Sequence, residues 1–155
     1  MEARIADGSL QEEWFPDGSC FGCGPANQDG LGLRSFAAGD EVVAEWRPHP
    51  RHGALTDVVS GGVVGTLLDC HAGAAVFRAV GDRDGRVPYV GADPWVTVSY
   101  TIDLLRPTPV DRTLHLRAHV TELDGGEARV VGAIEVGGTP TATISAVFRR
   151  LQPRV

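Results

Sequence analysis

The chain has 155 residues, about one domain, and its composition of 43% hydrophobic and 22% charged residues is that of a globular protein. Its net charge of −6 argues against binding to nucleic acid or to an anionic membrane, because both need a surplus of Lys and Arg. The acidic N-terminus does not resemble a secretory signal, and an odd number of cysteines does not indicate a disulfide framework. A cytoplasmic location is therefore expected.

The N-terminal segment, residues 1–30, is rich in Gly, Pro, Asp and Asn and is predicted to be loop with a short helix at Leu10–Trp14. We expect it to pack on a single domain at residues 31–151. That domain begins with two short runs of alternating apolar residues, LGLRSF (31–36) and EVVAEW (41–46). Their pattern predicts a first hairpin.

The central segment is VVSGGVVGTLLDCHAGAAVF (58–77), preceded by a proline-containing loop at 47–57. Ser60 is a common N-cap residue, and the apolar spacing after it predicts a helix over Gly61–Ala79. Because apolar residues occupy nearly every side of this helix, other structure must surround it. Asp69 then needs an explanation, since a buried acid is rarely tolerated unless it is paired or used.

The C-terminal part begins with a predicted polar loop at 81–88. Four runs of alternating apolar residues then predict long antiparallel strands, at 95–105, 113–123, 128–136 and 139–151. In the first of these, one face is expected to carry Val96, Val98, Tyr100, Ile102 and Leu104. The order of hairpin, helix and strands indicates an α+β fold, an antiparallel sheet of five to six strands wrapped around one long central helix.

Three motifs connect the sequence to a known family: CFGCGPANQDGLGL (20–33), SGGVVGTLLD (60–69) and VTVSYTIDLLRPTP (96–109). Together they resemble the hotdog-fold acyl-CoA thioesterases of the PaaI-like, or 4-hydroxybenzoyl-CoA thioesterase-like, branch. The likeness spans most of residues 20–150, with Ser60 in place of the family's usual histidine. It implies hydrolysis of an acyl-CoA or acyl-carrier thioester, in a homodimer or homotetramer with the active site between protomers. No cofactor is implied beyond the coenzyme A of the substrate.

The candidate catalytic residues are Gly61, Gly62, Asp69 and Thr97. Gly61 and Gly62 present backbone N–H groups at a helix N-terminus, where a substrate oxyanion can approach without meeting a Cβ. Asp69 follows Gly62 by about two turns on the same side of the helix and is predicted to be a general base or a nucleophile, with its pKa raised by burial. The resemblance implies that Thr97 of a partner chain places a hydroxyl near this carboxylate. Ser60 is expected to cap the helix.

The candidate substrate-binding residues are Ser60, His52, Thr66 and Arg106. Arg106 ends a strand in the Arg-Pro motif and is expected to meet a CoA phosphate. Two alternatives to hydrolysis stay open: a non-catalytic acyl-CoA or small-ligand binding module on the same fold, and an enoyl-CoA hydratase or dehydratase, in which His52 would supply the missing histidine. His71 lies about 200° around the helix from Asp69 and is expected to be a packing or interface residue.

The Cys20-x-x-Cys23 pair raises the question of zinc, with His49, His52 or Cys70 as further ligands. No second Cys-x-x-Cys or His-x3–5-His pattern follows at the usual spacing. The sequence therefore predicts no metal site, and a loop folded over the domain with buried thiols.

Overall fold

A computed structural model describes residues 7–85 and 94–152 of the chain. Residues 1–6 of the predicted N-terminal segment and residues 86–88 of the predicted polar loop lie outside the described residues. The elements in chain order are α1 (Leu10–Trp14), β1 (Phe36–Ala38), β2 (Glu41–Trp46), the 3-10 turn η1 (Pro50–His52), β3 (Gly53–Leu55), β4 (Val58–Val59), α2 (Gly61–Asp84), β5 (Trp95–Leu104), β6 (Leu114–Asp124), β7 (Glu127–Val136) and β8 (Thr139–Arg150).

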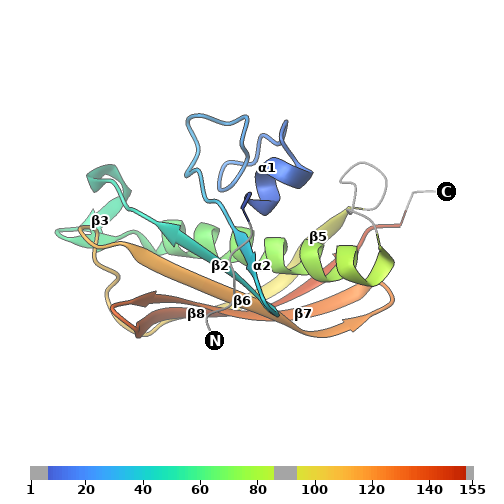
Figure 1. Cartoon of the computed structure of the whole chain (residues 1–155). Coiled ribbons are helices and arrows are strands. Elements are labelled where there is room, and N and C mark those ends of the chain that lie inside the picture. The colour runs from blue at the N-terminus through green and yellow to red at the C-terminus, as the bar shows by residue number, and fades with distance from the viewer. Residues whose placement is uncertain (1–6, 86–93, 153–155) are drawn as a thin grey trace.

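Six strands form one antiparallel sheet in the order β1-β2-β6-β7-β8-β5. Helix α2 lies across one face of this sheet, and α1 with the N-terminal loop covers the other side of the helix (Figure 1). This arrangement confirms the predicted hotdog fold. Strand β5 follows α2 in the chain, and among the described strands it pairs with β8 alone, so it forms an edge of the sheet.

The hydrophobic core lies between α2 and the sheet. Leu67 and Leu68 of α2 are 0% and 1% exposed, and Leu114 and Leu116 of β6 are 0% and 2% exposed. Each such leucine contributes about 2 kcal/mol relative to an exposed side chain. By length and composition α2 is long and apolar enough to cross a membrane, but more than half of its most apolar window is buried inside the fold. It therefore packs as a core helix.

The first predicted strand, residues 31–36, is wrong. The backbone amides of Leu31 and Leu33 donate to carbonyls of the N-terminal loop at 2.8 and 3.0 Å, which takes this segment away from the sheet. Strand β1 starts only at Phe36 and pairs with β2 through a turn at Gly39, whose φ of 60° favours glycine. Residues 31–36 alternate in polarity because some of their side chains are buried against the loop, and not because the segment pairs as a strand.

The predicted end of the central helix is also wrong, because α2 continues beyond Ala79 to Asp84. Arg78 pairs with Asp82 one turn later at 3.5 Å, which supports the extra turn. The helix ends at Gly85, which has the left-handed φ of 66° of a common C-cap. The predicted loop at 47–57 also contains η1 and β3, and β3 forms a small second sheet with β4.

A β-bulge in β5 changes which side chains face α2. Thr97 pairs with Phe148 of β8, and Ser99 pairs with the next residue of β8, so Val98 is an extra residue. After the bulge the alternation shifts by one, and Tyr100 shares a face with the buried Ala146. The predicted single face is therefore wrong: Thr97 faces α2 before the bulge, and Tyr100, Ile102 and Leu104 face it afterwards.

A buried polar network joins α1, α2 and β2 through His71, which is 0% exposed. Its Nε2 lies 2.9 Å from the Val42 carbonyl, so this nitrogen carries the proton, and its Nδ1 lies 2.9 Å from the Ser35 hydroxyl. Gln11 of α1 completes the network by donating to the Ser35 hydroxyl at 3.1 Å and accepting from the Ser35 amide at 2.7 Å. Burial lowers the pKa of His71 to about 4, which keeps the ring neutral. His71 is thus the packing residue that its helical position predicts.

Replacing His71 with alanine is expected to lower the free energy of unfolding by about 3 kcal/mol, because it opens a cavity and removes the imidazole partner of the Ser35 hydroxyl and of the Val42 carbonyl. Urea unfolding followed by circular dichroism measures this. The matched control is His115→Ala: His115 is exposed and its only ion pair in the described part of the chain is with Glu45, so less than about 0.5 kcal/mol is expected. Equal effects of the two substitutions would contradict the structural role of His71.

Candidate active site

Helix α2 begins at Gly61 with backbone amides that no side-chain cap occupies. Ser60 stands at the N-cap position, but its side chain makes no cap hydrogen bond, so the predicted capping role is wrong. Ser60 is held by its backbone instead: its amide donates to the His52 carbonyl at 2.8 Å, and its carbonyl accepts from the Val64 amide at 3.0 Å. Gly61 and Gly62 are exposed. Their amides carry the partial positive charge of the helix N-terminus and suit a developing oxyanion.

A groove of about 490 Å³ follows α2 from this helix entrance to Asp69. Its walls include Phe21 of the N-terminal loop and Tyr100 of β5. The α2 face between the walls carries glycines at 61, 62 and 65, so the helix backbone itself is the floor. A ligand can therefore lie against the helix without displacing side chains.

Asp69 is half-buried in the middle of α2, and its Oδ1 accepts a hydrogen bond from Thr97 Oγ1 at 2.7 Å. Burial raises the pKa of Asp69, the Thr97 hydrogen bond opposes this rise, and negative charge on Cys20 adds to it. The expectation that Thr97 of a partner chain meets this carboxylate is corrected, because the hydroxyl that binds it belongs to the same chain. The β5 bulge at Val98 explains the difference, since it leaves Thr97 facing α2 of its own chain.

A second cavity of about 500 Å³ lies on the other side of Asp69. The N-terminal segment covers it with Trp14 and Phe15, and Phe77 of α2 and Phe148 of β8 line it from below. The Phe15 and Phe77 rings meet edge to face with centroids 5.0 Å apart. Asp69 thus stands between a groove that leads to the helix entrance and a mainly apolar chamber.

The two candidate catalytic positions on α2, Gly61 and Asp69, lie far apart along the helix. Gly61 and Asp69 are eight residues apart, and this separation amounts to about 12 Å along a helix axis. One thioester carbonyl cannot touch both the Gly61 amide and the Asp69 carboxylate of the same helix. A reaction that uses both groups needs the amide of one chain and the carboxylate of another.

The predicted substrate-binding residues do not all meet in the groove. Thr66 lines it, with its hydroxyl donating to the Gly62 carbonyl at 2.9 Å. Arg106 lines a separate hollow of about 400 Å³ beside Gly61, together with Leu104.

His52 does not line the groove, and its ring has structural contacts. Its Nδ1 accepts from the His49 amide at 2.9 Å, and the ring packs on Trp46 with centroids 4.9 Å apart. Burial, with the nearby charges of Arg51 and His49, lowers the pKa of His52. Within one chain, therefore, no imidazole of His52 meets the Asp69 carboxylate, which is the pairing that the hydratase alternative needs.

Sequence reasoning missed the apolar chamber and its cover. The available signals were the aromatic residues Trp14 and Phe15 after a short predicted helix, and the spacing of Cys70, Gly73, Ala74 and Phe77 on one helical face. That spacing describes a face of α2 that the sheet does not cover. Only the fold shows that the N-terminal segment returns to cover it.

The comparisons with known proteins agree with this architecture. A sequence profile described as the thioesterase superfamily matches residues 56–145. A thioesterase superfamily protein from Shewanella loihica PV-4 superposes with a TM-score of 0.62 at 29% identity, over 83% of this chain and 98% of that one. The E. coli PaaI protein gives 0.64 at 18% identity, over 79% and 81%. A hypothetical thioesterase from Streptococcus pneumoniae TIGR4, solved with coenzyme A, gives 0.60 at 15% identity, over 75% and 82%.

No curated protein sequence matches the chain. The family profile nevertheless covers more than half of the chain, from the turn before the helix entrance to the last strand, and so includes Gly61, Asp69 and Thr97. The chain therefore belongs to the thioesterase superfamily.

Proposed function

We propose that this protein hydrolyses the thioester of an acyl-CoA or acyl-carrier substrate at a site shared by two copies of the chain. Membership of the thioesterase superfamily supports thioester hydrolysis as the general activity. The observation that carries the finer proposal is the position of Asp69, half-buried, bound by Thr97 and placed between a groove and an apolar chamber. A carboxylate with a raised pKa in such a place is suited to accept a proton from water.

In the proposed reaction the substrate carbonyl oxygen accepts hydrogen bonds from the Gly61 and Gly62 amides of one chain. Asp69 of the other chain removes a proton from water, and the water oxygen attacks the carbonyl carbon. The tetrahedral oxyanion then collapses, the C–S bond breaks, and the thiolate leaves and takes up a proton. Asp69 as a direct nucleophile is the second form of this reaction, with an anhydride that water then hydrolyses. Thr97 orients the carboxylate in both forms, and neither form needs a metal or redox cofactor.

The substrate has three parts that match three parts of the site. We assign the acyl group to the apolar chamber between Trp14 and Phe77, because its aromatic lining favours an apolar or aryl chain. The pantetheine arm follows the groove past Thr66, and the predicted contact of Ser60 with the substrate would lie just outside the groove lining. Arg106, beside the hollow at the helix entrance, is assigned to a phosphate of CoA. The coenzyme A in the S. pneumoniae structure supports a ligand of this class.

The test is thiol release from a panel of acetyl-, hexanoyl-, benzoyl- and palmitoyl-CoA, with the free acid identified by mass spectrometry. Hexanoyl- or benzoyl-CoA is expected to react faster than acetyl-CoA, and thiol and acid should form in equal amounts. Binding of these compounds without thiol release would favour the binding module. Hydration of an enoyl-CoA without thioester cleavage would favour the hydratase. Either result would overturn the proposal.

A homodimer, or a tetramer built from such dimers, is proposed to form through β5. This edge strand is ten residues long and carries exposed apolar side chains, including Val98 at 45%, Tyr100 at 53% and Leu104 at 59% exposure. Its unpaired backbone groups are a template for a second strand. Pairing two β5 strands antiparallel continues the sheet and brings the helix entrance of one chain toward Asp69 of the other.

Replacing Val98 with glutamate is therefore expected to give a folded monomer whose kcat for thiol release falls at least about a hundredfold. Near a two-fold axis the new charges face one another, and a monomer lacks the partner's oxyanion donor. Sedimentation velocity and a thiol assay on the same sample measure both effects. The control His119→Glu puts the same charge on an exposed position of β6, away from the sheet edge. A fully active Val98→Glu dimer would exclude β5 as the interface.

A further inference from the structure

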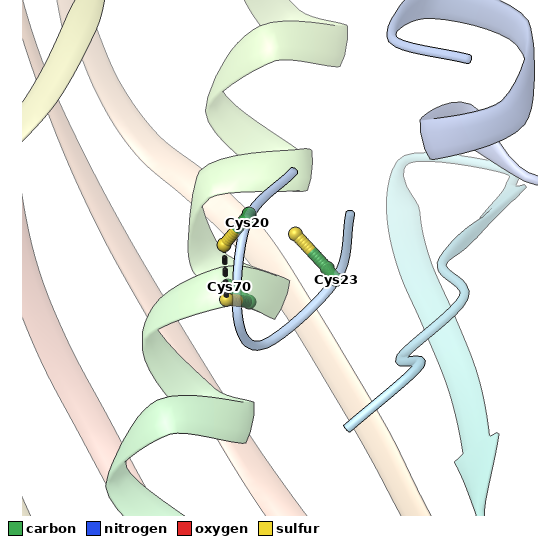
Figure 2. A group of neighbouring side chains, drawn as sticks. All are labelled: Cys20, Cys23 and Cys70. Atoms are coloured by element: carbon green, nitrogen blue, oxygen red, sulfur yellow. Dashed lines mark hydrogen bonds between the residues drawn. The ribbon is translucent and has the colours of Figure 1, made fainter. Parts of the chain in front are cut away.

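Three cysteine side chains meet beside the active-site groove, although they come from two distant segments. The Sγ atoms of Cys20, Cys23 and Cys70 all lie within 4.8 Å of one another, and those of Cys20 and Cys70 are 3.8 Å apart. Cys20 and Cys23 belong to one turn of the N-terminal loop, and Cys70 projects from the middle of α2 (Figure 2). All three are free thiols. The sequence predicted buried thiols here and no common site; the prediction of burial is wrong, because Cys20 is exposed and Cys23 and Cys70 are half-buried.

The loop backbone is shaped to bring the thiols together. A Cβ on Gly22 would overlap the Cys70 sulfur and would lie 2.9 Å from the Thr66 methyl group, so the turn passes directly over α2. A Cβ on Gly24 would overlap the backbone of Cys20, because the turn closes through a hydrogen bond from the Gly24 amide to the Cys20 carbonyl at 2.8 Å. Both positions therefore require glycine.

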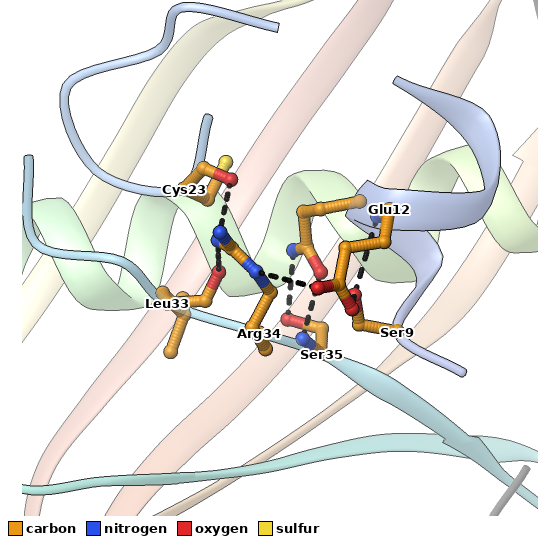
Figure 3. A network of polar contacts seen from close by, with 7 residues as sticks. Ser9, Glu12, Cys23, Leu33, Arg34 and Ser35 are labelled. Carbon is orange, nitrogen blue, oxygen red and sulfur yellow. Dashed lines mark hydrogen bonds and ion pairs between the residues drawn. The ribbon is translucent and has the colours of Figure 1, made fainter. Parts of the chain in front are cut away.

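A second set of contacts fixes the other end of this turn. Arg34 donates to the Cys23 carbonyl at 3.1 Å and to the Leu33 carbonyl at 2.9 Å, and it forms an ion pair with Glu12 of α1 at 3.8 Å (Figure 3). The guanidinium places a positive charge beside the thiol cluster. The three sulfurs are thus held by backbone and side-chain contacts that do not involve the cysteine side chains themselves.

The spacing of the sulfurs matches tetrahedral metal coordination. A Zn–S bond is about 2.3 Å, so two thiolates on one tetrahedral zinc lie about 3.8 Å apart. The Cys20–Cys70 pair has this separation, and Cys23 needs only a small side-chain movement to reach it. A disulfide would need two sulfurs about 2.05 Å apart. The spacing thus suits three sulfurs around one ion, and no two of the sulfurs form a disulfide.

The chemistry of the ligands also fits. Three thiolates are a soft ligand set that selects zinc over magnesium or calcium. The hydrogen bond with the Cys70 thiol lowers the pKa of Cys20 to about 4.

We propose that Cys20, Cys23 and Cys70 form a three-thiolate site for zinc that clamps the N-terminal loop to the centre of α2. Zinc takes four ligands, and the exposed side of Cys20 leaves the fourth position to water or to an incoming ligand. The clamp fixes the wall between the groove and the apolar chamber, next to Asp69. The sequence has no second Cys-x-x-Cys pair, and Cys70 of α2 supplies the third sulfur instead. His49 and His52 are not ligands of the proposed site.

The test is a zinc titration of the full chain, reduced and stripped of metal, in competition with a chromophoric chelator. One Zn²⁺ per chain is expected, with an apparent Kd of about 10 nM or below. Titration with Co²⁺ should produce thiolate-to-metal charge-transfer absorption. Zinc binding below a tenth of an equivalent, a cobalt spectrum without that absorption, or isolation of the chain with a stable Cys20–Cys70 disulfide would each overturn the proposal.

The variants Cys20→Ser and Cys23→Ser should each raise the Kd for Zn²⁺ at least about a hundredfold. Both residues lie in the loop, so the domain folds without them, and circular dichroism confirms this before titration. Ser19→Ala, in the same turn, and His49→Ala are the matched controls and should bind zinc as the wild type does. Wild-type affinity in Cys23→Ser would exclude the site. Because the readout is metal stoichiometry without substrate, the result is independent of whether the protein hydrolyses thioesters.

Discussion

Replacing Asp69 with asparagine is expected to lower kcat for thiol release about a thousandfold, while KM changes little. Asparagine has the size of aspartate and its amide oxygen still accepts the Thr97 hydrogen bond, so the helix and both cavities keep their shape. What is lost is the ability to remove a proton from water or to attack the carbonyl. A thiol-trapping assay with the best acyl-CoA of the panel measures both kinetic constants.

The matched control for this substitution is Asp103→Asn. Asp103 is an exposed carboxylate on β5, close in sequence to the groove-lining Leu104 but on the other face of the strand. Its loss changes the net charge by the same amount without touching the groove, and wild-type kinetics are expected. An Asp69→Asn enzyme with more than about a tenth of wild-type kcat would exclude Asp69 from the chemistry.

The elements that the sequence predicts well are those whose pattern and burial agree. The helix at Leu10–Trp14 is confirmed without change, and the four C-terminal strands start and end within one residue of the predicted positions. Strands β6 and β8 alternate between a buried and an exposed face over much of their length, so periodicity locates them. The failures occur where local pattern and tertiary contact disagree. Residues 31–36 alternate like a strand but pack on the loop, and Val98 carries no sequence signal that marks it as a bulge.

The candidate site also has parts that the sequence predicts and parts that depend on tertiary contacts. The Gly61-Gly62 entrance and Asp69 stand out in the sequence because glycine pairs and acids are unusual in a buried helix. Their separation of about 12 Å follows from helix geometry, but the proposal that two chains share the site also depends on which groups face the groove, and the sequence does not show that. The meeting of Cys70 with Cys20 depends on a contact across 50 positions, and no local pattern encodes such a contact.

Two inactive variants are expected to restore activity when they are combined in one dimer. The first is Asp69→Asn, and the second is Gly61→Pro, which deletes the first helix amide. Proline is tolerated at the first helical position, and Ser60 already has the extended φ of −53° and ψ of 134° that a following proline requires. Each homodimer should be nearly inactive, because both of its sites lack one group.

A heterodimer of these two chains, isolated with two different affinity tags, contains one site with both groups intact and one site with both defects. It should therefore show about half of the wild-type rate per dimer. If each site lay within a single chain, every site of the heterodimer would carry one defect and the rate would stay at the level of the parents. Gly61→Ala keeps the amide but adds a Cβ 3.2 Å from the Leu104 side chain, so it should be more active than Gly61→Pro and separate the loss of the N–H group from the effect of added bulk. The recovered rate thus tests directly whether the oxyanion donor and the carboxylate come from different copies of the chain.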